Sequence, residues 1–192
     1  AKSPFTAEAI SRLATKGRVV IVYDPDFPKQ EMGEVTIAAF FPDFYSENGP
    51  NKDFLAVVGR FGGNWSARDL APVIAHELTG HGMQRFRGRN EHVRVVELEC
   101  EAYLYQEKAY QDLGFDKNAN EMVAFRQQME RRWCYDFRRW LAKQRPARMA
   151  LWERRNPDVP GLLKDYLDYI DTLRKSGVAG KARDAHHSIV EI

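Results

Sequence analysis

The sequence has no long hydrophobic run and no marked excess of charge of either sign. No run of about 18 apolar residues occurs, which excludes an ordinary transmembrane helix, and the first residues lack the apolar core of a signal peptide. The formal net charge is +2, from 29 basic and 27 acidic residues. The whole molecule therefore offers no field that favours nucleic acid or an anionic membrane. We expect a soluble protein, either cytoplasmic or exported after a leader is removed.

Cysteine is also scarce, since Cys100 and Cys134 are the only two in the chain. Both lie in helical patterns that are rich in large apolar residues, where a buried free thiol is the commoner state. Isolated cysteine pairs seldom form disulfides outside oxidising compartments. The sequence thus favours two buried free thiols over a disulfide.

The first third of the chain contains short β-branched runs bounded by turn residues. Residues 17–23, 34–41 and 53–59 have this pattern, and each is flanked by Gly, Pro, Asn or Asp. We expect three strands that form a small mixed sheet.

Helical patterns dominate the rest of the sequence. Ser66, with Asp69 three residues later, predicts the start of a helix that carries the first histidines. A second helix is expected over residues 93–113, ended by Gly114. The fold class is therefore α+β, with a core over residues 1–117 and a helical extension of the same domain over residues 118–192.

The most informative motif is HELTGH at residues 76–81. It is close to the H-E-x-x-H zinc signature, but it contains one extra residue between the histidines. On a straight α-helix His76 and His81 would diverge by about 140°, so they could not share an ion. A π-bulge or a helix break at Gly80 would realign them, and both distortions are compatible with glycine. The alternative is that both histidines cap a helix end and that Glu77 is solvated.

A third ligand is expected on the second helix. Helical projection places Glu99 on the flank of a mainly apolar stripe, whereas Glu97 and Glu101 point with Lys108 to the opposite side. A carboxylate on an apolar face needs a cation or several donors, which favours Glu99 as the ligand. Glu97 and Glu101 are interpreted as solvated. The alternative for Glu99 is a buried ion pair with an arginine such as Arg94, and Gln106 could line the same cleft.

The two segments together resemble the gluzincin branch of the zincin metallopeptidases. The shared features are His76, Glu77 and His81, followed by Glu99 with Ala three residues later, and the resemblance covers about residues 50–113. It implies that Zn²⁺ is held by the two histidines and Glu99, with Glu77 as the general base. It also implies that an edge strand, at residues 53–59, aligns an extended substrate.

The chain departs from the gluzincin pattern at two points. One is the extra residue in the motif, a spacing that is also similar to that of the modulator-of-gyrase peptidases. The other is Tyr103, which stands where gluzincins commonly have an Asp that supports a histidine ligand.

We therefore predict a zinc-dependent hydrolase that cleaves a peptide or protein substrate. Glu77 would take a proton from water and deliver it to the leaving amine. The donor for the developing oxyanion, or a residue supporting the ligands, is expected among Tyr103, Tyr105 and His92. A non-catalytic zincin-like scaffold, in which the extra residue has spoiled the metal site, is the alternative function.

Other sequence features carry less weight. His186 and His187 lie in a polar tail that favours exposure over ligation. Basic residues alternate with aromatic ones over residues 125–155, a composition found in nucleic-acid binding proteins. The aromatics recur at helical spacing, however, which favours a core-facing stripe with arginines outside. Nucleic acid is thus not the expected partner, and the sequence does not indicate an oligomeric state.

Overall fold

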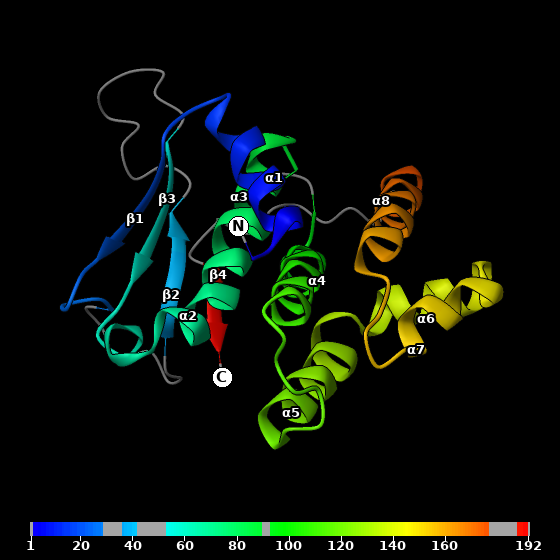
Figure 1. Cartoon of the computed structure of the whole chain (residues 1–192). Coiled ribbons are helices and arrows are strands. Elements are labelled where there is room, and N and C mark those ends of the chain that lie inside the picture. The colour runs from blue at the N-terminus through cyan, green and yellow to red at the C-terminus, as the bar shows by residue number, and fades with distance from the viewer. Residues whose placement is uncertain (1, 29–35, 42–52, 90–92, 177–187, 192) are drawn as a thin grey trace.

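The structure is a computed structural model that describes residues 2–28, 36–41, 53–89, 93–176 and 188–191. It has the predicted α+β class, with a sheet on one side and helices on the other (Figure 1). The elements follow the chain in the order α1 (Pro4–Ala14), β1 (Val19–Tyr23), β2 (Thr36–Phe41), β3 (Phe54–Val58), η2 (Gly62–Asn64), α2 (Ala67–Ile74), η3 (Ala75–His81), α3 (Gly82–Phe86), α4 (Val95–Asp112), α5 (Asn120–Gln128), η4 (Met129–Trp133), α6 (Tyr135–Gln144), η5 (Pro146–Arg148), α7 (Met149–Glu153), α8 (Val159–Lys175) and β4 (Ser188–Glu191).

The sheet contains the three predicted strands and one more. Its order is β1-β3-β2-β4, with β1 and β3 parallel and β2 antiparallel to both β3 and β4. The expectation that residues 53–59 form an edge strand is wrong, because β3 pairs with a strand on each side. The fourth strand brings the end of the chain back to the sheet, so the part after residue 118 is not only helical.

A single helical rod crosses the molecule beside the sheet and consists of α2, η3 and α3. Its start is as predicted, since the Ser66 hydroxyl accepts a hydrogen bond from the backbone N–H of Asp69. The middle of the rod, η3, is a π-helix that runs from Ala75 to His81. The predicted distortion of the metal motif is thus present, and it takes the form of π-helical turns within a continuous helix.

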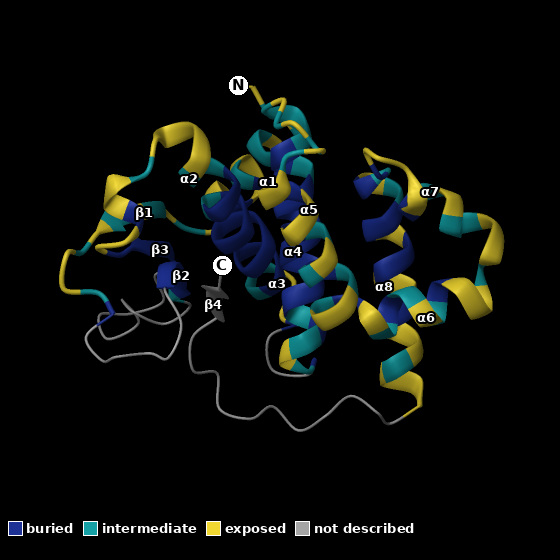
Figure 2. Cartoon of the chain, turned by 90° about the horizontal axis from the view of Figure 1, so that it is seen from below, coloured by how far each residue is buried: buried dark blue, intermediate teal, exposed yellow. Residues whose placement is uncertain are grey.

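Helix α4 lies at the centre of the helical part and is buried along most of its length (Figure 2). It packs against η3 on one side and against α8 and η4 on others. Gly114, which follows the helix, has a φ of 70°, the left-handed conformation expected of a glycine that ends a helix. Helix α4 therefore links α8 and η4 to the rod that carries HELTGH.

The two cysteines form a disulfide, so the prediction of free thiols is wrong. The bond joins Cys100 of α4 to Cys134, which follows η4. Both residues are buried, as expected, but the fold places their Cα atoms 4.8 Å apart. The disulfide therefore anchors η4 to α4 one residue after Glu99.

The aromatic residues of the segment 125–155 mainly pack inward. Phe137 and Trp152 are buried, and Phe137 also contacts Tyr166 and Tyr169 of α8. Arginines cover this layer, as Arg126 does over the Trp152 ring.

No helix in the described part of the chain is long and apolar enough to cross a membrane.

Candidate metal centre

Three potential metal ligands meet at the contact between η3 and α4. His76 and His81 come from η3 and Glu99 from α4, and all three are buried. The Nε2 atoms of the two histidines lie 3.2 Å apart. The Glu99 carboxylate faces both of them, at 3.3 Å from His76 and 3.5 Å from His81.

The π-helix is what allows the two histidines to face each other. Each π-turn contains more residues than an α-turn, so the extra residue in the motif is absorbed without breaking the rod. Gly80 lies directly against α4, where an added Cβ would be 2.6 Å from both the Cα and the Cβ of Ala102. The glycine therefore brings η3 close enough to α4 for Glu99 to reach the histidines.

The spacing of the three groups suits a small tetrahedral cation. Zinc binds imidazole nitrogen and carboxylate oxygen at about 2.0–2.2 Å, so neighbouring ligand atoms in a tetrahedron lie about 3.3 Å apart. The observed separations of 3.2, 3.3 and 3.5 Å agree with that value. Three protein ligands would leave a fourth position for water or substrate.

The histidines are held in the form that binds metals. Nδ1 of His76 lies 3.0 Å from the side-chain oxygen of Gln106, and Nδ1 of His81 lies 2.9 Å from that of Gln84. Burial lowers the pKa of His76 to about 3 and that of His81 to about 4. Both rings are therefore neutral near pH 7, and protons on Nδ1 leave both Nε2 lone pairs pointing at the same space.

Glu77 follows the first histidine and is fully buried in η3. Neither of its carboxylate oxygens has a hydrogen-bond partner within the described ranges. Burial, and secondly the charge of Glu99, raise the pKa of Glu77 well above its usual range, although the backbone amide of Phe40 acts in the opposite direction. Burial of a carboxyl with so little compensation is costly, which makes Glu77 a candidate for a functional group.

The residues proposed to support the site have different positions. The Tyr103 ring meets the His76 ring edge-on, with centroids 4.8 Å apart, so Tyr103 contacts one of the candidate ligands. Tyr105 instead stacks on Phe5, away from the histidines. His92, His186 and His187 lie outside the described residues.

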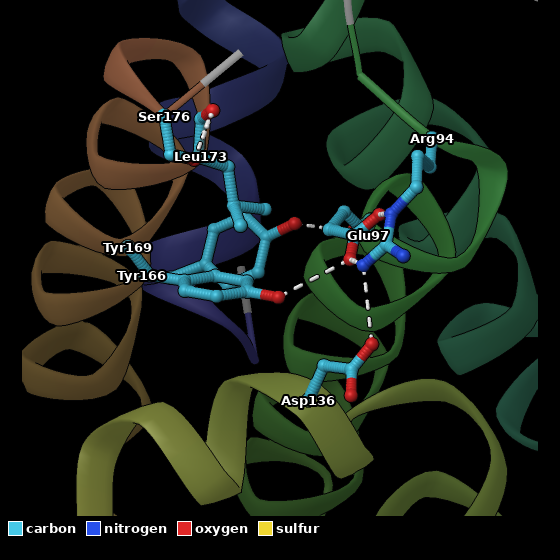
Figure 3. A network of polar contacts seen from close by, with 7 residues as sticks. All are labelled: Arg94, Glu97, Asp136, Tyr166, Tyr169, Leu173 and Ser176. Carbon is cyan, nitrogen blue, oxygen red and sulfur yellow. Dashed lines mark hydrogen bonds and ion pairs between the residues drawn. The ribbon is translucent and has the colours of Figure 1, made fainter. Parts of the chain in front are cut away.

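The interpretation of Glu97 and Glu101 as solvated is wrong. Glu97 pairs with Arg94, which also reaches Asp136, and Tyr169 donates a hydrogen bond to the Glu97 carboxylate (Figure 3). Glu101 pairs with the buried Arg89 and, at 3.1 Å, with Arg87. Arg94 is therefore occupied by Glu97, and the alternative of a Glu99–Arg94 pair does not occur.

Gln84 is the site residue that the sequence analysis missed. It lies three residues after His81, a spacing at which helical side chains meet, and that spacing was the available signal. Gln106, expected to line the cleft, does contact a ligand.

Comparison of the chain with models of known protein families, with curated proteins and with solved structures gives no match. The site must therefore be interpreted from its own geometry.

Proposed function

We propose that this protein is a zinc-dependent hydrolase that cleaves amide bonds in peptides or proteins. The observation that carries the proposal is the approach of two neutral imidazoles, whose Nε2 atoms lie 3.2 Å apart in front of the Glu99 carboxylate. Two lone pairs at that distance repel each other unless a proton or a metal ion lies between them.

The chemistry of the ligands favours zinc. Imidazole nitrogen suits zinc, copper, iron and nickel, whereas magnesium and calcium prefer sites made of oxygen alone. Two imidazoles and one carboxylate with a fourth position open form a common catalytic zinc set.

Glu77 supplies the remaining function. A zinc ion at this site would lower the pKa of water at its open position to about 7 and would polarise a substrate carbonyl. The carboxylate of Glu77, next in sequence to His76, would accept the proton of the attacking water. It would then deliver that proton to the nitrogen of the departing amine.

Burial of the whole site supports a second candidate, a non-catalytic scaffold. The four residues at the site, His76, Glu77, His81 and Glu99, are each at most 2% exposed. Such burial is typical of a structural metal site, in which the ion holds helices together. In this function the ligands would stabilise the contact between η3 and α4, and no turnover would follow.

The variant Glu77→Gln tests the proposal. The protein is reconstituted with zinc, and metal content and cleavage of a fluorescent unfolded protein substrate are measured together. We expect the variant to keep its zinc and to lose about 10²–10⁴-fold in kcat, since it lacks the general base but no ligand.

Glu121→Gln, at the exposed start of α5, is the matched control and should change neither quantity. If wild-type protein binds zinc but shows no turnover that depends on Glu77, the scaffold function replaces the hydrolase. Loss of zinc from Glu77→Gln would instead make Glu77 a ligand.

A further inference from the structure

Gln84 connects two ligands that belong to different helices. Its side-chain oxygen lies 2.9 Å from Nδ1 of His81, and its NH₂ group donates to the backbone carbonyl of Leu98 at 2.7 Å. A carbonyl oxygen only accepts hydrogen bonds, so the amide has a single satisfactory orientation. Its oxygen must therefore face His81, which fixes the proton on Nδ1.

Leu98 directly precedes Glu99. Gln84 thus bonds both the ring of one ligand and the main chain that carries another. The residue is fully buried, and water does not compete for either bond.

Gln106 forms the corresponding connection in the reverse direction. It comes from α4, accepts from Nδ1 of His76 at 3.0 Å, and donates to the Tyr110 hydroxyl at 3.3 Å. Gln106 and Tyr110 follow Glu99 at helical spacing, so they lie on the same face of α4. The contact between the rod and α4 is therefore stabilised by one glutamine from each of them, Gln84 from the rod and Gln106 from α4.

We propose that Gln84 and Gln106 are positioning residues that hold both imidazoles as Nδ1–H tautomers, with Nε2 directed at the metal position. The inference rests on the proposed metal site and adds what organises it. Both residues are amides, so they orient the rings without adding negative charge. Among the described residues, the carboxylates at the site that would balance a bound divalent ion are those of Glu99 and Glu77, and Arg132 also acts on Glu99.

The two partners of the amides differ in a way that can be tested. The Tyr110 hydroxyl can donate as well as accept, so it can turn to serve a carboxylate at position 106. Gln106→Glu should therefore keep the His76 bond and retain metal. Tyr110→Phe should remove the hydrogen bond that orients the Gln106 amide while keeping the aromatic packing.

The experiment measures zinc affinity by chelator competition for Gln84→Met, Gln106→Met, Gln106→Glu, Tyr110→Phe and the Gln106→Met/Tyr110→Phe double variant. Gln111→Met is the matched control, because Gln111 is also on α4 but bonds to Glu107 and to the Pro157 carbonyl. Thermal unfolding of the metal-free variants reports on the fold. The absorption of bound Co²⁺ reports on the geometry of the ligands.

We expect each Met variant to bind zinc about 10- to 100-fold more weakly and to alter the Co²⁺ spectrum. Tyr110→Phe should cost about two- to tenfold, the effect of one hydrogen bond, and should cost nothing further when Gln106 is already Met. Gln106→Glu and Gln111→Met should stay near wild type in affinity and spectrum.

The inference is overturned if both Met variants bind zinc as wild type does. It is also overturned if Gln106→Glu is as weak as Gln106→Met, since Glu keeps an oxygen that can accept from Nδ1 of His76, and that hydrogen bond would then not be what supports zinc binding. Failure of the wild-type protein to bind zinc would instead refute the proposed function, so the two failures are distinguishable.

Discussion

Helix α4 carries glutamates on two faces, and their partners differ. On one face Glu97 pairs with Arg94, and Glu101 pairs with Arg89. On the other face Glu99 meets the Nε2 atoms of two neutral histidines. All three glutamates are buried to a similar degree, so burial alone does not separate them.

The difference separates the carboxylates that pair with arginine from the one that faces the candidate metal centre. Glu97 and Glu101 are balanced by arginine and bind α4 to its neighbours. Glu99 faces lone pairs, and burial raises its pKa, although electrostatic interactions with His81 and Arg132 act in the opposite direction. A cation between Glu99 and the histidines would satisfy all three groups at once.

The largest effect on stability is expected from a substitution on the arginine-paired face of α4, and the same substitution on the Glu99 face should act on zinc binding instead. Glu101→Ala leaves the buried Arg89 without its carboxylate, so we expect a loss of about 3–5 kcal/mol in the free energy of unfolding. Glu99→Ala should instead weaken zinc binding at least about tenfold and leave the metal-free protein folded. Urea unfolding and zinc titration of both variants check this, and exchanged effects would refute the division of α4 into two faces.

The next largest effect on stability is expected from removal of the disulfide. Its Cys100 lies on α4 between Glu99 and Glu101. For a sequence separation of 34 residues, loss of the cross-link in Cys100→Ala/Cys134→Ala should cost about 3–4 kcal/mol. Zinc affinity should change little, since the two cysteines are bonded to each other and are not among the candidate ligands. Thiol titration of unfolded wild-type protein should find no free thiol, and two free thiols would contradict the disulfide.

Substitution of Gly80 tests how closely the face of α4 that carries Glu99 must approach the rod. Gly80→Ala places a methyl group against Ala102 and should cost about 1–3 kcal/mol in stability together with part of the zinc affinity. Gly82→Ala is the control. Its Cβ would meet a Leu13 methyl group at 3.0 Å, which is the movable end of a side chain, whereas the Cβ at position 80 would meet the backbone of Ala102. Equal unfolding temperatures for the two variants would contradict the role assigned to Gly80.

Deletion of Gly80 restores the usual H-E-x-x-H spacing. Because the glycine is packed against α4, we expect the deletion to disrupt the site. Retained zinc binding would mean that the π-helix is only an accommodated insertion.

The smallest effect concerns pH. Burial raises the pKa of Glu77, so the folded metal-free chain keeps a proton that the unfolded chain loses, and stability should fall as pH rises. The histidines, with pKa values of about 3 and 4, act in the opposite sense, but only below about pH 6.5. The unfolding temperature of metal-free protein should therefore decrease as the pH rises above about 6.5, where the histidines no longer oppose the effect of Glu77.

Glu77→Gln should flatten this decrease, and zinc should reduce it in the wild type. Scanning calorimetry across the pH range measures both. A slope that is unchanged in Glu77→Gln would show that another group causes it.

The sequence was sufficient where the signal is local. Strands β1, β2 and β3, the Ser66 cap and the end of α4 at Gly114 follow from neighbouring residues, whereas β4 was not predicted. The spacing of His76 and His81 predicted a distortion, either a π-bulge or a helix break, and the structure has the π-helical form. Helical projection singled out Glu99 from Glu97 and Glu101, and the structure places Glu99 against the two histidines.

The remaining features depend on packing between distant segments. Projection placed Glu97 and Glu101 opposite Glu99 but could not show that α8 and Arg89 cover that side. The disulfide depends on where η4 lies, and the central position of β3 depends on strand order. Helix α1 was missed although Ser3 caps it and Pro4 opens it, which are local signals.

The most direct test of the central claim is the zinc content of the protein. Wild-type chain reconstituted with zinc and then mildly dialysed should retain about one equivalent, as expected for a site with three protein ligands. His76→Ala, His81→Ala and Glu99→Ala should each lose it, while Glu97→Gln should retain it. Less than about a tenth of an equivalent in the wild-type protein, even with zinc added back, would contradict a metal centre at the contact between η3 and α4.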